Sequence, residues 1–205
     1  MEQQPEHTKG TQPEHSTQQR PSVWVGSWLD YNDGRLHGCW LDAARDAAVL
    51  ERDIAAMLAA SPTARATGQL AEDRGIFDAD GFGTLNIGEQ ASLTWVSAVA
   101  QGIAKHGAAF AAYAALVANE NGLHTFDDAF LGAYESADAY VEQLIDDLGI
   151  SAQLDQAVPG RLRYYVQFDT AMLARDMQAE GSIHVTDAND GGVWIFDEAA
   201  LHDSG

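Results

Sequence analysis

The stretch DDAFLGAYESADAYVEQLIDDLG, which runs from Asp127 to Gly149, changes its periodicity half-way along. Its first part places the aromatic residues Phe130 and Tyr134 around the small Gly132, an alternation typical of a short strand. Its second part repeats its apolar residues at helical spacing. A strand that leads into an amphipathic helix predicts a mixed α+β fold.

The helix predicted in the second part has an apolar face and recognisable ends. Ser136 is a favourable N-cap, Asp138 lies near the positive end of the helix dipole, and Gly149 can end the helix. The residues expected on its buried face are Ala137, Val141, Leu144 and Leu148. One face of this helix should therefore pack on the protein, and the other should meet solvent or a partner.

The outer face of this helix concentrates negative charge. Asp138, Glu142 and Asp146 recur every four residues, so they stand in one row, with Glu135 and Asp147 beside it. Like charges at this spacing destabilise a helix by a few tenths of a kcal/mol each. The residues from Glu135 to Asp147 would span about 20 Å of helix, so their five carboxylates give one charge per roughly 4 Å. One strand of duplex DNA carries one phosphate per ~3.4 Å. The row predicts a DNA-like surface; a solvated face of an acidic protein is the alternative.

The whole chain is strongly acidic. Its 205 residues hold 31 acids and 11 bases, a formal net charge of −20, and residues 120–205 alone hold 17 acids and 3 bases. Such a charge excludes direct binding of nucleic acid or of an anionic membrane and favours a cationic partner. The single Cys39 excludes an internal disulfide and fits a reducing compartment. Without an apolar signal segment or membrane span, the sequence predicts a cytoplasmic protein.

The chain begins with a polar segment and continues into an α+β unit. Residues 1–21, with QPEHT repeated as QPEHS, predict a disordered tail. In SVWVGSWLDYNDGRLHGCWLD, residues 22–42, we expect one strand through Val23, Val25 and the Trp28/Leu29 pair, a turn at residues 31–34, and a second strand over residues 36–41. A helix over residues 44–60 and a mobile connection over 61–74 should follow.

Three tryptophans lie beside these predicted strands. Trp24, Trp28 and Trp40 could stack on nucleic-acid bases, but packing of a sheet against a helix is the more frequent reason for such residues. The sequence DADGFGTLNIGE, residues 78–89, resembles a calcium loop, yet Phe82 occupies a ligand position and the preceding residues predict a strand. We therefore expect a strand, a glycine-rich turn and a short second strand there, with no metal.

The rest of the chain predicts helices and a final hairpin. Residues 91–119 should form two helices interrupted near residues 105–107, with Leu93, Val96, Val99, Ala100, Ile103, Phe110, Tyr113, Leu116 and Val117 packed inward. Residues 151–160 form a short segment for which neither a helix nor a strand is predicted. A helix should start near Asp169 and bury Met172, Leu173 and Met177. The hairpin should turn at Asp190, Gly191 and Gly192.

Several phrases, in order, carry a family resemblance. They are VWVGSWLDYNDGRLHGCWLD, IFDADGFGTLNIGEQASL, FLGAYESADAYVEQL and the late FDTAMLARDMQAEG before the hairpin. With these phrases the chain resembles the ArdA-type antirestriction proteins over nearly all of residues 22–198. The resemblance implies proteins of mobile elements that imitate bent duplex DNA and occupy the DNA-binding groove of type I restriction–modification enzymes.

The resemblance also implies an architecture and a binding surface. The expected fold is α+β, with three small domains in series that form an elongated, curved acidic body and pair as a homodimer. We place the domains at residues 22–90, 91–126 (central and helical) and 127–205, after the tail 1–21. The expected partner-binding surface comprises Asp127, Asp128, Glu135, Asp138, Glu142, Asp146, Asp147, Asp169 and Asp176. Residues 90–119 contain no acid and would interrupt this surface.

Two other functions compete with DNA mimicry. An acidic scaffold or chaperone for basic proteins would share the charge but not the quoted phrases. A hydrolase using paired carboxylates would need two of them to converge across a cleft, whereas neighbours such as Asp127 and Asp128, or Asp146 and Asp147, point apart on a helix. No sequence motif of a nucleophile, phosphate loop or metal site appears. We therefore predict a protein that is not an enzyme and that needs no cofactor.

Overall fold

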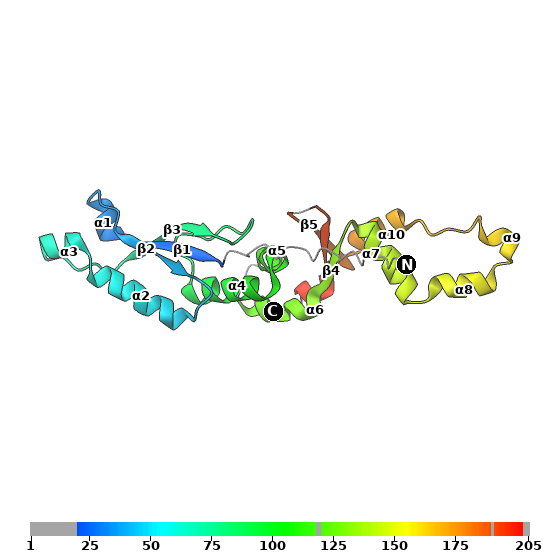
Figure 1. Ribbon diagram of the computed structural model, residues 1–205, viewed down its shortest axis with the longest axis horizontal. Coiled ribbons are helices and arrows are strands. Elements are labelled where there is room, and N and C mark those ends of the chain that lie inside the picture. The colour runs from blue at the N-terminus through cyan, green and yellow to red at the C-terminus, as the bar shows by residue number, and fades with distance from the viewer. Residues whose placement is uncertain (1–19, 118–119, 190, 203–205) are drawn as a thin grey trace, which may run out of the picture.

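The computed structural model describes residues 20–117, 120–189 and 191–202. The molecule is elongated, with the first sheet at one end and α9 at the other, and after α9 the chain returns to the middle (Figure 1). The mixture of helices and two small antiparallel sheets confirms the α+β fold class. The three domain boundaries, the curvature and the homodimer stay predictions. Residues 1–19 of the predicted tail and Asp190 of the predicted turn lie outside the described residues.

Short strands and helices are mixed along the chain. They are β1 (Ser22–Ser27), α1 (Trp28–Asn32), β2 (Gly38–Asp42), α2 (Ala47–Ala59), α3 (Pro62–Thr67), β3 (Arg74–Asp80), α4 (Leu93–His106), α5 (Ala108–Val117), the 3-10 helix η1 (Asn121–Thr125), α6 (Phe126–Ala129), β4 (Phe130–Tyr134), α7 (Ala137–Asp147), α8 (Ile150–Ala157), α9 (Gly160–Arg163), α10 (Thr170–Ala179), β5 (Ile183–Asp187), β6 (Val193–Asp197) and α11 (Glu198–His202).

The first sheet has the order β2-β1-β3, and α2 covers one of its faces (Figure 1). Alternate residues of β1 supply that face: Val23 and Val25 are fully buried, and both belong to one core with Leu50 and Ile54 of α2. Just before the sheet, the carbonyl of Pro21 accepts a hydrogen bond from Ala43. Residues 20 and 21 are therefore part of the folded unit rather than of a disordered tail.

Two N-terminal predictions are wrong because a buried network shapes this region. The first strand stops at Ser27, whose hydroxyl caps α1 by accepting from the Asp30 amide at 3.3 Å, so Trp28 and Leu29 begin a helix. Residues 61–74 are not a loose connection, since Ser61 caps α3. Asp30 joins the two segments: its carboxylate accepts from Ser61 Oγ at 2.6 Å and from the Thr63 amide at 2.9 Å.

The Asp30 carboxylate is fully buried without a cationic partner among the described residues. Burial by itself raises the pKa of the Asp30 carboxyl. Hydrogen bonds from Ser61, Ser27 and Thr63 outweigh that effect and hold this pKa well below its usual range. The charged form of Asp30 is thus part of the folded structure, as a fixed link between α1 and α3.

Two further expectations for residues 22–90 are corrected. Trp24 and Trp40 do not pack the sheet against α2, because both lie on the face opposite to the one that α2 covers, whereas Trp28 packs α1 on the sheet through Phe77, 4.9 Å away between ring centroids. The strand β3 forms where expected, but residues 81–90 contain no second strand after it. Their backbone is held instead by the hydrogen bond from the Ile76 amide to the Glu89 carbonyl at 3.0 Å, next to the glycine-rich turn.

The two central helices confirm the interruption predicted near residues 105–107. α4 ends at His106, Gly107 follows with φ +78, and α5 begins at Ala108. All the residues expected inside α4 are buried, and in α5 only Leu116 is exposed against expectation. Leu116, in the last turn of α5, is 36% exposed. Tyr113 is fully buried and donates to the Gly122 carbonyl at 2.8 Å.

The second sheet, of order β4-β6-β5, confirms the predicted strand and hairpin. Aromatic rings join it to the central helices: Phe126 lies 5.0 Å from Phe110 and 5.1 Å from Phe130 between ring centroids, and Phe130 lies 5.5 Å from Phe196. One hydrophobic core therefore extends from the first sheet through α4 and α5 to Phe196 of β6.

Beyond the second sheet, α7 and α10 share a small core of their own. It consists of Val141, Ile145 and Ala174, with Met177 packed against it. The helix predicted from Asp169 is confirmed, but Met172 and Leu173 are exposed, as is Leu148 after α7. These three residues are exposed because nothing in the described chain covers the outer sides of these short helices, so burial is limited to one residue per turn.

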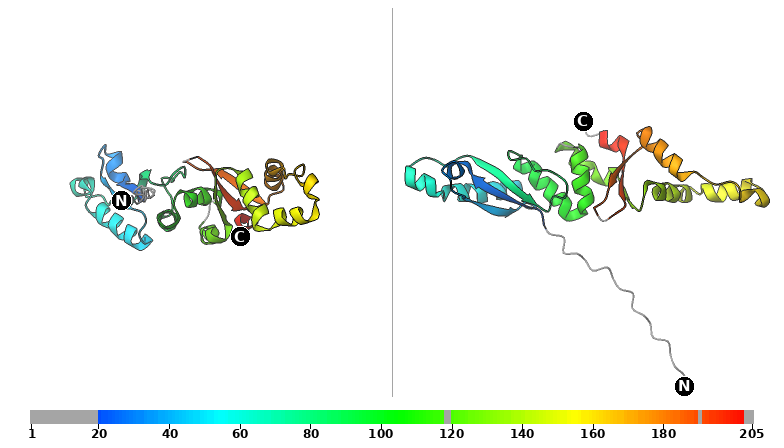
Figure 2. Two further views of the ribbon diagram at one scale, coloured as in Figure 1. Left: turned by 45° about the vertical axis from the view of Figure 1, so that its right-hand side comes forward. Right: turned by 90° about the horizontal axis from the view of Figure 1, so that it is seen from above.

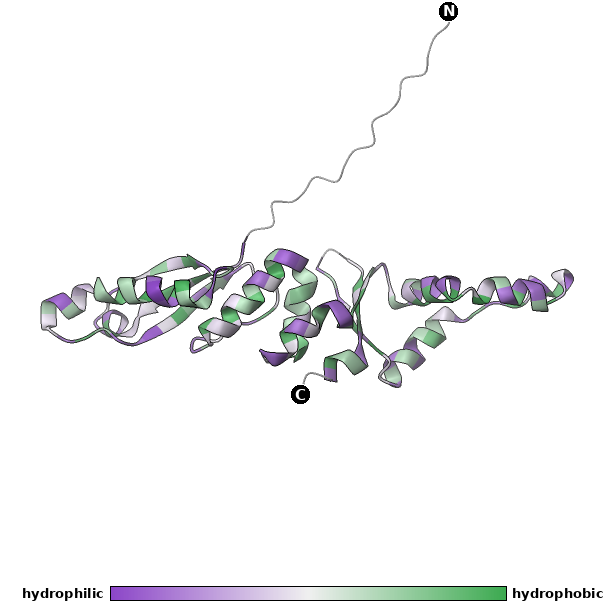
Figure 3. Cartoon of the chain, turned by 90° about the horizontal axis from the view of Figure 1, so that it is seen from below, coloured by the Kyte–Doolittle hydropathy of each residue, from purple (hydrophilic) through white to green (hydrophobic). Residues whose placement is uncertain are grey.

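The segment between α7 and α10 forms an arm that the sequence did not predict. α8 and α9 have no buried residue, and they extend away from the second sheet to the end of the molecule (Figure 2). Figure 3 shows polar and apolar residues mixed along this arm. In the described part of the chain, no helix is long and apolar enough to cross a membrane.

Candidate partner-binding surface

The predicted acidic row lies on α7, which is built as the sequence indicated. Ser136 caps the helix by accepting from the Ala139 amide at 3.1 Å. Val141 and Ile145 attach it to the protein, and Tyr140 meets Tyr134 of β4 with 5.2 Å between ring centroids. Burial, followed by the nearby Tyr134 and Asp197, raises the pKa of the Tyr140 hydroxyl, which keeps this contact uncharged at neutral pH. These contacts orient the remaining face of α7 outward.

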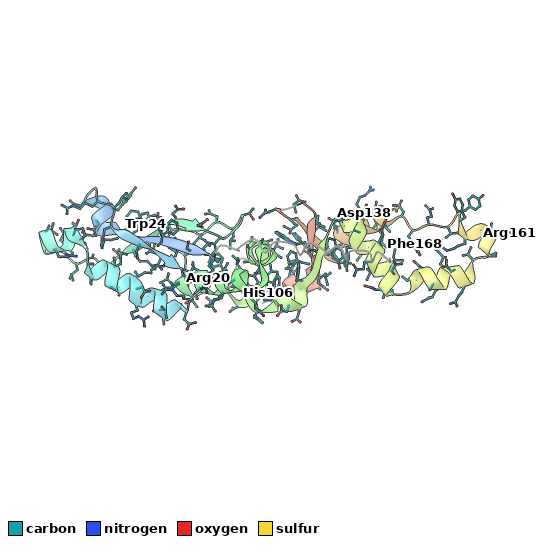
Figure 4. The ribbon with its side chains drawn as sticks, viewed as in Figure 1. Arg20, Trp24, His106, Asp138, Arg161 and Phe168 are labelled. Carbon is teal, nitrogen blue, oxygen red and sulfur yellow. The ribbon has the colours of Figure 1, made fainter. Side chains whose placement is uncertain are left out.

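That outward face is a line of carboxylates. Asp138, Glu142 and Asp146 follow at one-turn intervals, about 6 Å apart along the axis. Asp138 is half-buried, whereas Glu142 and Asp146 are exposed, as are Glu135 and Asp147. Asp138 is labelled on α7 in Figure 4. The carboxylate of Asp146 accepts a hydrogen bond from the Ser151 hydroxyl at 3.1 Å.

No cation neutralises this row within the described chain. None of the ion pairs between residues 20–117, 120–189 and 191–202 involves the five carboxylates from Glu135 to Asp147. The row therefore keeps its full negative charge while its members repel one another. Like charges held together on a rigid helix attract a cationic surface, because the partner's charges relieve that repulsion.

The other predicted acids are distributed over two separate places. Asp128 is exposed on α6, and Asp127 beside it pairs with Lys105 of α4 at 3.6 Å and lies 3.6 Å from Nδ1 of His106. Asp169 and Asp176 belong to α10, the helix that packs against α7. The helix α10 therefore lies beside α7, which carries the acidic row, whereas Asp127 and Asp128 of α6 lie apart from that row.

The acids on α10 do not have equal roles. Asp169 caps the helix by accepting from the Met172 amide at 2.9 Å, so its side chain has a structural task. Asp176 is exposed in the last turns of the helix, and its side chain caps no helix in the described part of the chain. Asp176 is therefore the better candidate for partner binding.

The described residues offer little for catalysis or metal binding at this surface. No group of three or more His, Cys, Asp or Glu side chains in that part of the chain is placed to hold a metal ion. The hollow nearest the start of α7, about 280 Å³, is lined by Ala133, Tyr134, Glu135, Ala188, Gly191, Val193 and Trp194, with Glu135 as its single carboxylate. A row of parallel charges can bind an extended cationic surface, but it does not converge on a substrate atom.

A family model described as antirestriction protein (ArdA) matches residues 23–190. The chain belongs to the ArdA antirestriction protein family. The matched residues include β1 from its second residue, β4, the central helices α4 and α5, the acidic row on α7, and α10. The match confirms the family resemblance found in the sequence. A comparison with curated proteins finds no match.

Membership gives this ArdA-family chain a general role. ArdA proteins are antirestriction proteins and not enzymes, and the family implies interaction with restriction enzymes. The family match does not point to individual residues, so the binding role of the nine predicted acids stays a prediction.

Sequence reasoning missed the exposed apolar side chains of the arm. Tyr164 and Tyr165 are 81% and 79% exposed, and Leu162 and Phe168 are 49% and 41% exposed. A signal was present in the run RLRYYVQF, residues 161–168, which holds three aromatic and two basic residues without a helical or strand period. Arg161 and Phe168 mark the two ends of this run in Figure 4.

Proposed function

We propose that this ArdA-family protein is a DNA mimic that occupies the DNA-binding groove of type I restriction–modification enzymes. The observation that supports this proposal best is the unneutralised carboxylate row on α7, with Asp138, Glu142 and Asp146 one turn apart. Counted with Glu135 and Asp147 beside it, the row carries one charge per roughly 4 Å, close to the spacing of phosphates along one DNA strand. The protein acts by occupancy alone, without catalysis or a cofactor, in the cytoplasm where incoming DNA would be cleaved.

The proposed mechanism is an exchange of counterions. Lysine and arginine side chains in a DNA-binding groove release condensed cations from DNA when they bind phosphate. Carboxylates held in a row offer the same partners to those side chains, so enzyme–inhibitor affinity should fall as salt rises. An elongated body lets several such contacts form along the groove at once (Figure 1).

The direct test is competition with DNA. A purified type I enzyme is titrated with this protein at a fixed concentration of a DNA duplex that contains its site, and DNA binding and cleavage are followed over a series of salt concentrations. We expect displacement of DNA that weakens steeply with salt. Equal binding to unrelated basic proteins would support the scaffold alternative, and failure to displace DNA from several type I enzymes would overturn the proposal.

The arm supports the homodimer that forms part of this proposal. Leu162, Tyr164 and Tyr165 are exposed there, and Arg161 and Arg163 are two of only three cations among residues 120–205. The arm is therefore the least acidic part of the C-terminal region. An apolar surface of this kind suits a second copy of the chain better than a basic groove.

We expect Tyr164→Ser/Tyr165→Ser to weaken dimerisation by about tenfold or more, because exposed tyrosines that become buried commonly dominate an interface. Light scattering coupled to size exclusion should give the parent about twice the 22.0 kDa chain mass at micromolar concentration and the variant a mass near one chain. Leu70→Ser, a change at another exposed apolar residue, is the control and should leave the dimer intact. A monomeric parent would contradict the homodimer.

A further inference from the structure

The uncovered face of the first sheet has an unusual composition. Opposite the face that α2 covers, cross-strand pairing produces a row of three glycines, because Gly26 of β1 pairs with Gly38 on one side and Gly75 on the other. Glycine is uncommon inside strands unless another group approaches the backbone closely. Here that group is a set of aromatic rings.

The rings lie directly on the glycine row. A Cβ atom added to Gly26 would come within 2.7 Å of Trp24 and 2.8 Å of Phe77, and one added to Gly75 would come within 3.0 Å of Trp28. The Phe77 ring contacts both tryptophans, with centroid distances of 5.6 Å to Trp24 and 4.9 Å to Trp28. The glycines thus make room for a layer of mutually inclined aromatic rings on the sheet.

This aromatic layer remains accessible to solvent. Tyr31 stacks on Phe77 at 5.2 Å and is 50% exposed, and Trp40 is 51% exposed. Figure 2 (right) shows this sheet from above, and α1, which carries Trp28 and Tyr31, packs on one end of this face; Figure 4 labels Trp24 on the sheet above α2. Tryptophan and tyrosine left in solvent on a rigid sheet are typical of a binding surface.

Carboxylates stand in the neighbouring rows of the same face. Trp24 pairs with Trp40 on one side and Asp78 on the other, and Ser22 of the next row pairs with Asp42 and Asp80. Asp78 and Asp80 are exposed. A hollow of about 410 Å³ beside them is lined by Ser22, Trp40, Asp78, Ala79 and Asp80.

The chain itself provides a guanidinium at the edge of this face. Arg20 pairs with Asp42, with 3.1 Å between Nη1 and Oδ2. Arg20 neutralises part of the charge at Asp42, whereas the hollow spans the sheet from Trp40 of β2 over Ser22 of β1 to Asp78 and Asp80 of β3. An arginine can therefore approach a carboxylate of this face while Trp40 stays exposed.

We propose that this face, made of Trp24, Trp40, Asp78 and Asp80, binds arginine side chains of a basic protein segment. It rests on the proposed function, since that segment would belong to the DNA-binding groove of the restriction enzyme. A guanidinium can stack on tryptophan and donate in-plane hydrogen bonds to a carboxylate at the same time, whereas the compact lysine ammonium cannot do both as well. The face thus adds arginine selectivity to the charge attraction of α7.

Charge decides between this occupant and the two others that an aromatic surface could take. Nucleic-acid bases could stack on the tryptophans, but their phosphates would meet carboxylates in a protein of net charge −20. A second copy of the chain would bring like charges face to face. A cationic segment is complementary to both the aromatic and the acidic groups.

The test compares nona-arginine and nona-lysine peptides on the full-length protein by isothermal titration calorimetry at two salt concentrations. We expect the parent to bind nona-arginine more tightly. Trp40→Leu should weaken nona-arginine binding by about threefold to fivefold and leave nona-lysine binding nearly unchanged, because an exposed cation–π contact has that size. Trp40 is half-exposed, so this change should not affect folding.

A second pair of variants tests the carboxylates at matched charge. Asp78→Asn/Asp80→Asn should weaken nona-arginine binding more than Asp46→Asn/Glu51→Gln, which removes the same charge from exposed acids at the start of α2, beyond the covered face. This comparison stands even where the tryptophan variant fails to fold.

Equal affinity for the two peptides, or equal effects of the two acid pairs, would overturn the proposal. Tighter binding of a single-stranded oligonucleotide, or loss of self-association in Trp40→Leu, would also overturn it in favour of the other occupants. Failure of the DNA-mimic proposal is separate: the parent would then not displace DNA from type I enzymes, while arginine selectivity at Trp40 would persist.

Discussion

The variant Asp138→Asn/Glu142→Gln/Asp146→Asn is expected to fold as the parent does and to inhibit a type I restriction enzyme about tenfold less well at low salt. Each substitution removes one of several screened charge contacts, and a single contact of this kind contributes ~1 kcal/mol or less. The side chains keep nearly the same size, and the repulsion between residues four apart disappears, so the helix should be as stable or slightly more stable. The row should therefore matter as a unit.

Salt provides the second measurement on this variant. Three lost charge contacts should make the slope of log affinity against log salt shallower by roughly two to three units. Circular dichroism and the competition titration are run on the same sample, so that loss of folding is recognised. Asp46→Asn/Glu51→Gln/Glu89→Gln is the matched control, because it also removes three negative charges, but from another part of the chain. A folded row variant that inhibits as well as the parent at every salt concentration would remove α7 from the binding surface.

The variant Asp30→Ala is expected to lower the free energy of unfolding by about 3 kcal/mol, because it leaves the buried Ser61 hydroxyl and Thr63 amide without their acceptor. Asp30→Asn keeps the shape and one acceptor oxygen, so about 2 kcal/mol is expected. Urea unfolding followed by circular dichroism measures both. Asp46→Asn is the control: Asp46 precedes α2 without a side-chain cap bond, and its loss should change stability by less than about 0.5 kcal/mol.

Acidification tests the same carboxylate in another way. The pKa of Asp30 is lower in the folded protein than the ordinary aspartate value of 3.8, so its stabilising contribution is complete above that value. The contribution is lost as pH falls below about 4 toward the folded-state pKa. The difference in stability between parent and Asp30→Asn should therefore shrink between pH 4 and pH 2; a constant difference would show that Asp30 contributes through shape alone.

Much of the local structure could be predicted because it depends on neighbours in the chain. Ser136 caps α7 and Asp169 caps α10 through bonds to amides three residues away. The end of α4 at His106 follows from Gly107, and the change of period at residues 130–137 separates β4 from α7. The acidic row needed only the 3.6-residue repeat of a helix. The family was likewise evident from the order of short phrases, and the family match confirms it.

Burial could not be predicted in the same way, because it depends on whether another element covers a residue. Leu148, Met172 and Leu173 have the spacing of a buried face, yet they are exposed since α7 and α10 meet only through a small core. The tryptophans show the same limit. Strand alternation places Trp24 and Trp40 on one face, but only the position of α2 on the other face leaves them open.

Long-range partners were the other feature that only the tertiary structure decided. Asp30 looks like one more acid in a turn, and nothing nearby in the sequence indicates that Ser61 and Thr63, 31 and 33 residues away, surround its carboxylate. The unprotected arm of α8 and α9 is similar, because its exposure follows from the absence of a covering element among the described residues. The sequence by itself determined the charge of this protein and the locally capped helices α7 and α10, since these follow from contacts within a few residues. Which surfaces remain open to a partner was decided only by the packing of distant segments, since a side chain is buried only when another part of the chain excludes water from it.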